Sequence, residues 1–222
     1  MKVLILEPHP DDALISTRAI ILDASKQSIF EILTLCEWRE NSSSEFAGDL
    51  DTLFSECKLP NNAFRLKLPN RSVKKLDDYA DAIKTNLDME LKISKMMRLI
   101  SAKISSFGPD MILSPLGLGH PDHVAVSWAV QALDTPVPIL YYVEFPYAFN
   151  RYGKILIHDA LSRGGKILTY ECPWDKSLMS KYYPKEWAVA LTLNGVWGVT
   201  GTQVNYVLSG LGRFANEFSN IC

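Results

Sequence analysis

The sequence predicts an α/β protein with a single-domain, Rossmann-like three-layer fold built on a mostly parallel sheet. Three observations support this prediction. Strand-like and helix-like segments alternate through the first two thirds of the chain, an order typical of parallel sheets with helices on both faces. The length of 222 residues fits one domain of ordinary size. Apolar residues make up 47% of the chain, which is enough for a large core.

The predicted strands are short apolar runs bounded by polar or turn-forming residues. In order, they are residues 2–7 (KVLILE), 28–36, 63–68, 110–115 and 138–145. The predicted helices carry apolar residues at helical spacing and cover residues 11–27, 44–59, 86–107 and 120–133. The helix over 86–107 has an apolar stripe, and Gly108-Pro109 ends it. That stripe consists of Leu87, Leu91, Ile93, Met97, Ile100 and Ile104.

The last third of the chain has weaker patterns. Residues 154–158 (KILIH) and 165–170 (GKILTY) are interpreted as two strands that form a hairpin. Residues 174–187 are aromatic and are predicted to be helical in part, whereas 188–212 are apolar and glycine-rich and receive no assignment. Because no linker or internal repeat is present, we treat residues 1–222 as one domain.

Composition excludes several classes of function. Lys and Arg total 23 and Asp and Glu total 25, so the net charge of -2 offers no basic surface for a nucleic acid. No apolar run approaches the roughly 20 residues of a membrane span. With no signal peptide visible and four cysteines that form no CxxC pair, we expect a cytoplasmic protein with reduced thiols.

Three of the four histidines fall in two short motifs, PHPDD at 8–12 and GHPDH at 119–123. Each motif follows a predicted strand, and ligands of parallel sheets bind beyond the carboxyl ends of the strands. Two imidazoles and one carboxylate around an open position are typical of hydrolytic zinc sites. Bound zinc can lower the pKa of a water molecule to about 7, and a spare carboxylate can then act as general base. The two motifs contain enough groups for both tasks.

These motifs resemble those of the LmbE-like, or PIG-L, zinc-dependent N-deacetylases. The resemblance covers about residues 1–145, and PLGLGHPDH at 115–123 is a particularly close match. It implies one divalent ion per chain, zinc or another divalent metal. It further implies hydrolysis of an N-acetyl group from a small-molecule amino-sugar substrate of the N-acetylglucosaminyl type.

The same resemblance assigns roles to individual residues. It implies that His9, Asp12 and His123 bind the metal and that Asp11 is the general base. His120 would polarise the carbonyl or stabilise the oxyanion, and could protonate the leaving amine. Asp122 would orient His120 and, we expect, favour its protonated form. For the sugar, we expect contacts from Arg39 and from aromatic residues after the fifth strand. The aromatic candidates are Phe145 and Tyr147.

Some positions depart from the family pattern. Ala13 stands where many members have Glu, and Leu68-Pro69-Asn70 stands where LPD is frequent. Both metal motifs lie within 1–150, while 151–222 matches the family poorly. The natural substrate, the acyl group, the pathway and the oligomeric state are therefore left open.

Three alternatives to a sugar deacetylase remain at this point. The chain could be a metal amidase for another N-acyl substrate. It could be a non-haem iron enzyme, because two histidines and one carboxylate also suit Fe(II). It could be a binding module without turnover, although the presence of both Asp11 and His120 argues against lost activity. Metal analysis, oxygen uptake and release of the amine product separate these classes.

Overall fold

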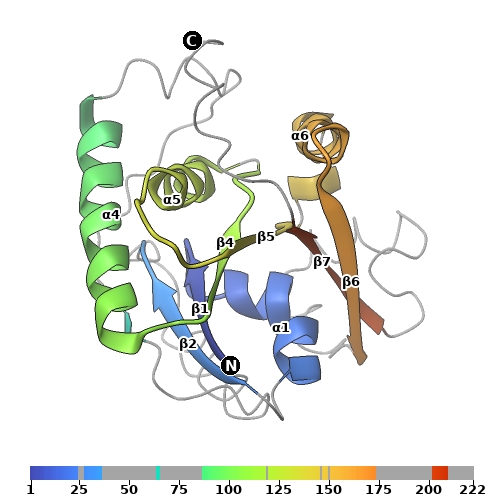
Figure 1. Ribbon diagram of the computed structural model, residues 1–222. Helices are drawn as coiled ribbons and strands as arrows, with labels where there is room; N and C mark the ends of the chain where they lie inside the picture. The colour runs from blue at the N-terminus through green and yellow to red at the C-terminus, as the bar shows by residue number, and fades with distance from the viewer. Residues whose placement is uncertain are drawn as a thin grey trace, which may run out of the picture.

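The computed structural model describes residues 1–24, 28–36, 64–65, 87–118, 120–145, 147–149, 151–173 and 202–209 of the chain. Their strands form one seven-stranded sheet in the order β3-β2-β1-β4-β5-β7-β6 (Figure 1). The strands are β1 (Lys2–Glu7), β2 (Ile29–Thr34), β3 (Phe64–Arg65), β4 (Met111–Pro115), β5 (Ile139–Tyr142), β6 (Lys166–Pro173) and β7 (Thr202–Ser209). The helices are α1 (Asp12–Ala24), α4 (Leu87–Phe107), α5 (Pro121–Gln131), α6 (Arg151–Ser162) and the short 3-10 helix η1 (Tyr147–Phe149).

The sheet is parallel over its first five strands and antiparallel at its other edge. β1 pairs in parallel with β2 and β4, and β2–β3 and β4–β5 are also parallel. β7 then pairs antiparallel with both β5 and β6. The predicted α/β fold with a mostly parallel sheet is thus confirmed.

Two apolar layers cover the two faces of the sheet. In β1, Leu4 and Leu6 belong to one buried cluster, whereas Val3 and Ile5 belong to another, as the two-residue period of a strand requires. The Leu4 cluster contains residues from α4 and α5, and the Val3 cluster contains residues from α1. The central strand is therefore buried on both faces, which explains why KVLILE is a continuous apolar run.

One prediction about the elements is wrong, and another is confirmed only in part. Residues 154–158 lie in α6 and not in a strand, so the predicted hairpin does not form; the neighbour of β6 is β7. The short apolar run KILIH fits a helix as well as a strand, because only its partners decide between them. In α4, the predicted stripe is confirmed at Ile93, Met97, Ile100 and Ile104, which lie in the core or pack against it. It is wrong at Leu91, which is 52% exposed, and it omitted the fully buried Met96.

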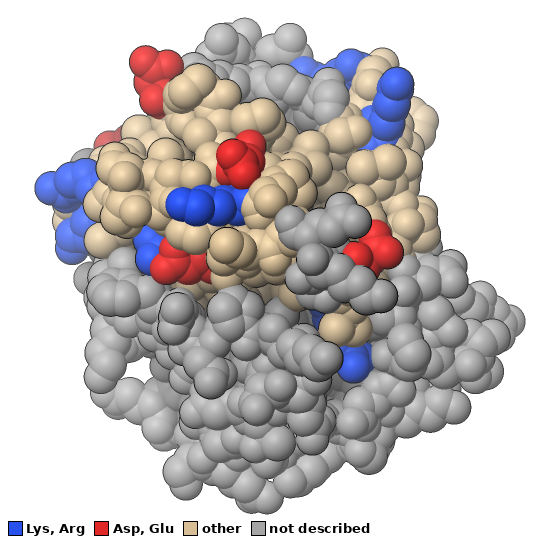
Figure 2. Space-filling view, turned by 60° about the horizontal axis from the view of Figure 1, so that its bottom comes forward, with Lys and Arg blue, Asp and Glu red and all other residues tan. Residues whose placement is uncertain are grey.

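Other expectations fall outside the described residues, namely those for 44–59 and 174–187. Among the helices that the structure does describe, none has both the length and the apolar content needed to cross a bilayer. On the face seen in Figure 2, acidic and basic side chains of the described residues are interspersed.

Candidate functional site

The two histidine motifs meet because their strands are neighbours. β1 pairs in parallel with β4, with Ile5 opposite Leu113, so both strands end at the same edge of the sheet. PHPDD follows β1 and GHPDH follows β4 at this edge. The topology of the sheet thereby brings together residues that are more than a hundred positions apart in sequence.

The first motif forms a tight turn between β1 and α1. The Asp12 N–H donates to the carbonyl of His9 at 3.1 Å, and the His9 N–H donates back to Asp12 Oδ2 at 2.8 Å. Asp12 is the first residue of α1, where the positive end of the helix dipole favours a carboxylate. Asp11 immediately precedes the helix and is 7% exposed.

The second motif forms the start of α5. His120 is the N-cap residue with extended backbone angles, φ -116° and ψ 136°, and Pro121 begins the helix. Pro at this position is favourable because the first N–H groups of a helix have no partner within it. The Asp122 N–H donates to His120 Nδ1 at 3.2 Å, which fixes the orientation of the ring.

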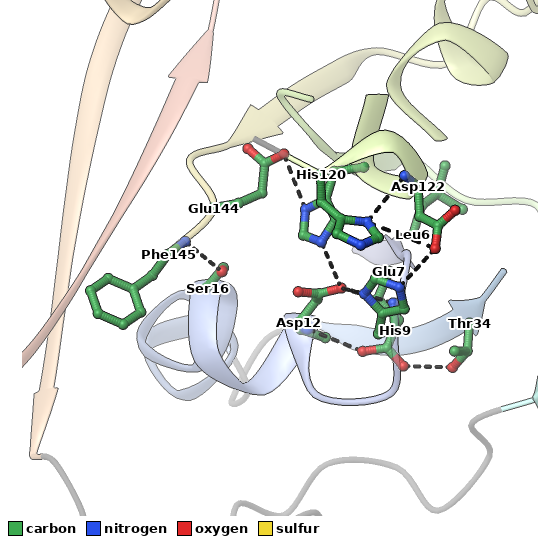
Figure 3. Close-up of polar contacts among 12 residues, drawn as sticks. Leu6, Glu7, His9, Asp12, Ser16, Thr34, His120, Asp122, Glu144 and Phe145 are labelled. Atoms are coloured by element: carbon green, nitrogen blue, oxygen red, sulfur yellow. Dashed lines mark hydrogen bonds and ion pairs between the residues drawn. The ribbon is translucent and has the colours of Figure 1, made fainter. Parts of the chain in front are cut away.

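Three histidine rings form a cluster at this edge of the sheet (Figure 3). The ring centroids of His9, His120 and His123 lie 5.0, 5.4 and 5.7 Å apart. One nitrogen from each ring lies within 4.8 Å of one nitrogen from each of the others, close enough for a single metal ion to contact them. His9 and His123 belong both to this group and to the metal-ligand set expected from the sequence.

Asp12 lies between the two histidines with which it was predicted to bind metal. Its Oδ2 atom is 3.3 Å from His9 Nδ1 and 3.3 Å from His123 Nε2. Ligand atoms placed about 2.0–2.1 Å from a tetrahedral zinc ion are separated by roughly 3.3–3.4 Å. In addition, neither ring nitrogen of the buried His123 makes a well-oriented hydrogen bond with the described residues. The residues present therefore fit a divalent metal.

A chain of charged contacts holds His9 in place. His9 Nε2 donates to Asp122 Oδ2 at 3.0 Å, and the other carboxylate oxygen of Asp122 accepts from Lys92 of α4. Burial alone lowers the pKa of His9, but its contacts with the carboxylates of Asp12 and Asp122 outweigh burial and raise that pKa to about 10. Burial raises the pKa of Asp122, but His9 and Lys92 outweigh it and hold the pKa well below its usual range.

The carboxylate of Asp122 thus contacts His9, and its backbone N–H contacts His120. The Asp122 carboxylate lies 3.8 Å from His120 Nδ1, beyond hydrogen-bond distance. Burial and repulsion from His123 lower the pKa of His120 to about 4, and the attraction of Asp122 does not offset them. The expectation that Asp122 keeps His120 protonated is wrong: the lowered pKa and the accepting Nδ1 atom both favour the neutral imidazole.

The three residues predicted to bind substrate have different outcomes. Arg39 lies outside the described residues. Phe145 is only 4% exposed, its backbone N–H donates to Ser16 of α1, and its ring points away from the histidines in Figure 3. The placement of Phe145 contradicts a substrate contact, because its ring is part of the packing. The half-buried ring of Tyr147 lies 5.1 Å from the His123 ring and 6.4 Å from the His120 ring.

Three charged residues of the site were not identified from the sequence. Glu7 and Glu144 are buried acids at the ends of β1 and β5, at the same edge as the motifs. Their position at strand ends was a usable signal, since apolar runs that end in an acid place it at this edge. Lys92 lies within a helix that carries many lysines, and nothing in its local sequence distinguishes it.

Solved structures with the same fold include deacetylases. A deacetylase complex from the biosynthesis pathway of teicoplanin has a TM-score of 0.55 at 16% identity, over 94% of this chain and 98% of that one. A deacetylase–teicoplanin complex has a TM-score of 0.53 at 14% identity, over 94% and 97% of the two chains. The zinc-inhibited form of teicoplanin deacetylase has a TM-score of 0.50 at 14% identity, over 94% and 98%.

Comparison with protein-family models and with curated proteins found no match. At identities of 14–16%, the structural similarity shows that this chain shares the fold of these deacetylases over nearly its whole length.

Proposed function

We propose that this chain is a metal-dependent deacetylase that hydrolyses an N-acetyl group of an amino sugar or sugar conjugate, of the N-acetylglucosaminyl type. The observation that carries this proposal is the position of Asp12 Oδ2, 3.3 Å from a ring nitrogen of His9 and 3.3 Å from one of His123. The fold shared with solved deacetylases supports it.

In this proposal, His9, Asp12 and His123 hold one divalent ion, with zinc as the first candidate. Such an ion would supply the site with a water molecule whose pKa is lowered to about 7. Asp11 is buried and immediately precedes the ligand Asp12 in the chain, and it accepts the proton of that water as general base. Two adjacent carboxylates thus have separate tasks, one toward the metal and one toward the proton.

His120 acts as a hydrogen-bond donor to the substrate carbonyl. Because Nδ1 accepts the Asp122 N–H, the single proton of the neutral ring is on Nε2. An Nε2–H group can donate to the carbonyl oxygen as negative charge develops there, without a protonated ring. A side-chain exposure of 38% leaves this ring accessible from outside.

The sugar would contact Tyr147 and Arg39. Aromatic faces pack well against the apolar face of a sugar ring, and Tyr147 is the aromatic side chain beside the histidine cluster. The role of Arg39 in binding sugar hydroxyls stays a prediction from the sequence.

Metal analysis tests the first part of the proposal. Wild type should hold about one divalent ion per chain, and His123→Ala should lose most of it, because two remaining ligands form a much weaker site. His158→Ala is the matched control, since His158 is an exposed histidine on α6. Full occupancy in His123→Ala would contradict the metal site. Since one fold neighbour is a zinc-inhibited form, the analysis should include other divalent ions and excess zinc.

A pair of carboxylate variants tests the division of roles. Asp11→Asn should keep its metal and lose roughly 10²–10⁴-fold in rate, because an amide cannot accept the proton. Asp12→Asn should lose metal as well as activity. If Asp11→Asn loses the metal and Asp12→Asn keeps it, the two roles are exchanged.

A substrate panel tests the reaction class. Release of acetate should be measured with N-acetylglucosaminyl compounds, acetylated glycopeptides and simple acetamides, with oxygen uptake measured in parallel. Equal rates of acetate release from simple acetamides and from all sugars would contradict a sugar deacetylase and support a metal amidase. Oxygen uptake without acetate release would instead favour the iron enzyme.

A further inference from the structure

Glu144 is a buried acid that joins the second histidine motif to β5. It follows β5, is fully buried, and was assigned no role from the sequence. Its Oε1 atom accepts the N–H groups of Gly117 at 2.7 Å and Leu118 at 2.8 Å. Its Oε2 atom accepts the N–H of Leu116 at 3.1 Å. Three backbone donors from one loop thus hold both oxygens of this carboxylate.

The same carboxylate faces His123. Glu144 Oε1 lies 3.4 Å from His123 Nδ1. Asp12 Oδ2 lies 3.3 Å from the other ring nitrogen, Nε2. The fully buried His123 ring therefore lies between two carboxylates, one that follows β5 and one in the metal-ligand set.

The loop that binds Glu144 is itself held against α5. Gly117 has φ +98°, and a Cβ atom there would lie 3.0 Å from the Ser127 Cβ. Ser127 Oγ also donates to the carbonyl of Leu116 at 3.0 Å. Because α5 carries His123, the loop, the carboxylate and the imidazole form one packed unit whose relative positions are set.

A carboxylate in this position favours a proton on Nδ1 of His123. The contact at 3.4 Å is electrostatic, since neither ring nitrogen has an aligned hydrogen-bond partner among the described residues. With the proton on Nδ1, Nε2 keeps its lone pair on the side of Asp12. Histidines that bind metals almost always donate their second ring N–H to a carboxylate, carbonyl or water, and loss of that partner typically lowers metal affinity 10–100-fold.

We propose that Glu144 is a positioning residue for the metal site: it holds the proton of His123 on Nδ1 and directs Nε2 toward the metal. This inference rests on the proposed function, because it takes His123 as a metal ligand. It goes beyond that function by extending the site to β5, through a residue that touches neither metal nor substrate.

Metal affinity of purified variants, measured for zinc by competition with a chelator, tests the inference. Glu144→Gln keeps the size of the side chain but removes its charge, and should weaken zinc binding roughly 10–100-fold. The control is Ser127→Ala, which loses a hydrogen bond to the same loop and leaves the side chains of Glu144 and His123 in place. Ser127→Ala should lower the melting temperature and keep the zinc affinity. Equal loss of zinc affinity in both variants would show that only loop packing matters, and would overturn the inference.

A second measurement does not depend on whether Glu144→Gln folds. Nitrogen NMR of isotopically labelled wild type should show that His123 Nδ1 carries a proton, both with and without zinc. An unprotonated Nδ1 in either state would overturn the proposal.

These results separate the inference from the proposed function. If His123→Ala keeps its zinc, the metal site itself is wrong. If His123→Ala loses zinc and Glu144→Gln binds it as tightly as wild type, only the positioning role fails.

Discussion

Glu7 should make the stability of the metal-free protein depend on pH. Its carboxyl group is 1% exposed at the end of β1, where Oε1 accepts from Thr34 at 2.5 Å and Oε2 accepts from the Ala13 N–H at 3.0 Å. Burial raises the pKa of Glu7 from 4.5 to about 8, against the lowering effect of those hydrogen bonds, and the charges of Asp12 and Asp11 raise it further.

The direction of the effect follows from the two pKa values. Below pH 4.5, Glu7 is protonated in the folded and unfolded chains, and its contribution to the folded state is fully present. Between pH 4.5 and about 8, the unfolded chain loses the proton while the folded chain retains it, so stability falls as pH rises. Above that range both states are ionised, and the contribution is lost.

The size of the effect follows from the same range. The pKa of Glu7 in the folded chain lies about 3.5 units above its value of 4.5 in the unfolded chain. Each unit corresponds to about 1.4 kcal/mol, so the full loss of stability is on the order of 5 kcal/mol at most. Glu7→Gln removes this dependence, because a neutral amide can accept from Ala13 and donate to the Thr34 hydroxyl. Relative to the variant, wild type should therefore lose stability steadily from pH 5 to pH 8.

Urea unfolding of metal-free protein, followed by circular dichroism at several pH values, measures this difference. The control is Asp23→Asn, which removes an exposed carboxylate from α1 and none of the buried contacts of Glu7. A difference between wild type and Glu7→Gln that stays constant from pH 5 to pH 8 would refute the reasoning, because Glu7 would then ionise as readily in the folded chain as in the unfolded one.

Three further predictions concern the surroundings of the site. Lys92→Met should lower the free energy of unfolding, measured with urea at neutral pH, by about 1–3 kcal/mol, because the buried Asp122 carboxylate loses a charged partner. An unchanged free energy of unfolding would mean that solvent and His9 already satisfy that carboxylate. Gly117→Ala should lower stability by about 1–3 kcal/mol, since φ +98° and the nearby Ser127 both oppose a Cβ, and an unchanged melting temperature would contradict this. Tyr147→Leu should raise KM for an acetylated sugar while metal content stays at the wild-type level, and an unaltered KM would remove this ring from the substrate site.

Local sequence patterns were sufficient for the fold class and for placing the two histidine motifs at one edge of the sheet. The run KVLILE predicted a strand, and β1 is a strand whose residues from Val3 to Glu7 are buried. The motifs PHPDD and GHPDH each followed a predicted strand, and in a parallel sheet the carboxyl ends of neighbouring strands lie together. These inferences hold because they need only the period of a strand, the period of a helix and the direction of the chain.

The tertiary structure decided whether ambiguous segments form helices or strands and which strands pair. Residues 154–158 became part of α6, because an apolar run of that length takes its form from its partners. β7 entered the sheet between β5 and β6, although residues 188–212 carried no pattern from which a strand could be assigned. Periodicity describes a segment by itself, whereas pairing and packing depend on segments distant in sequence.

The same distinction applies within the candidate site. The sequence predicted which motifs would approach one another, but not that Asp122 would contact His9 through its carboxylate and His120 through its backbone. Nor did it predict that Lys92 and Glu144, on α4 and after β5, would join them. Burial, ring orientation and pKa depend on distances of a few ångströms between elements, and only the packing of helices against the sheet determines those distances.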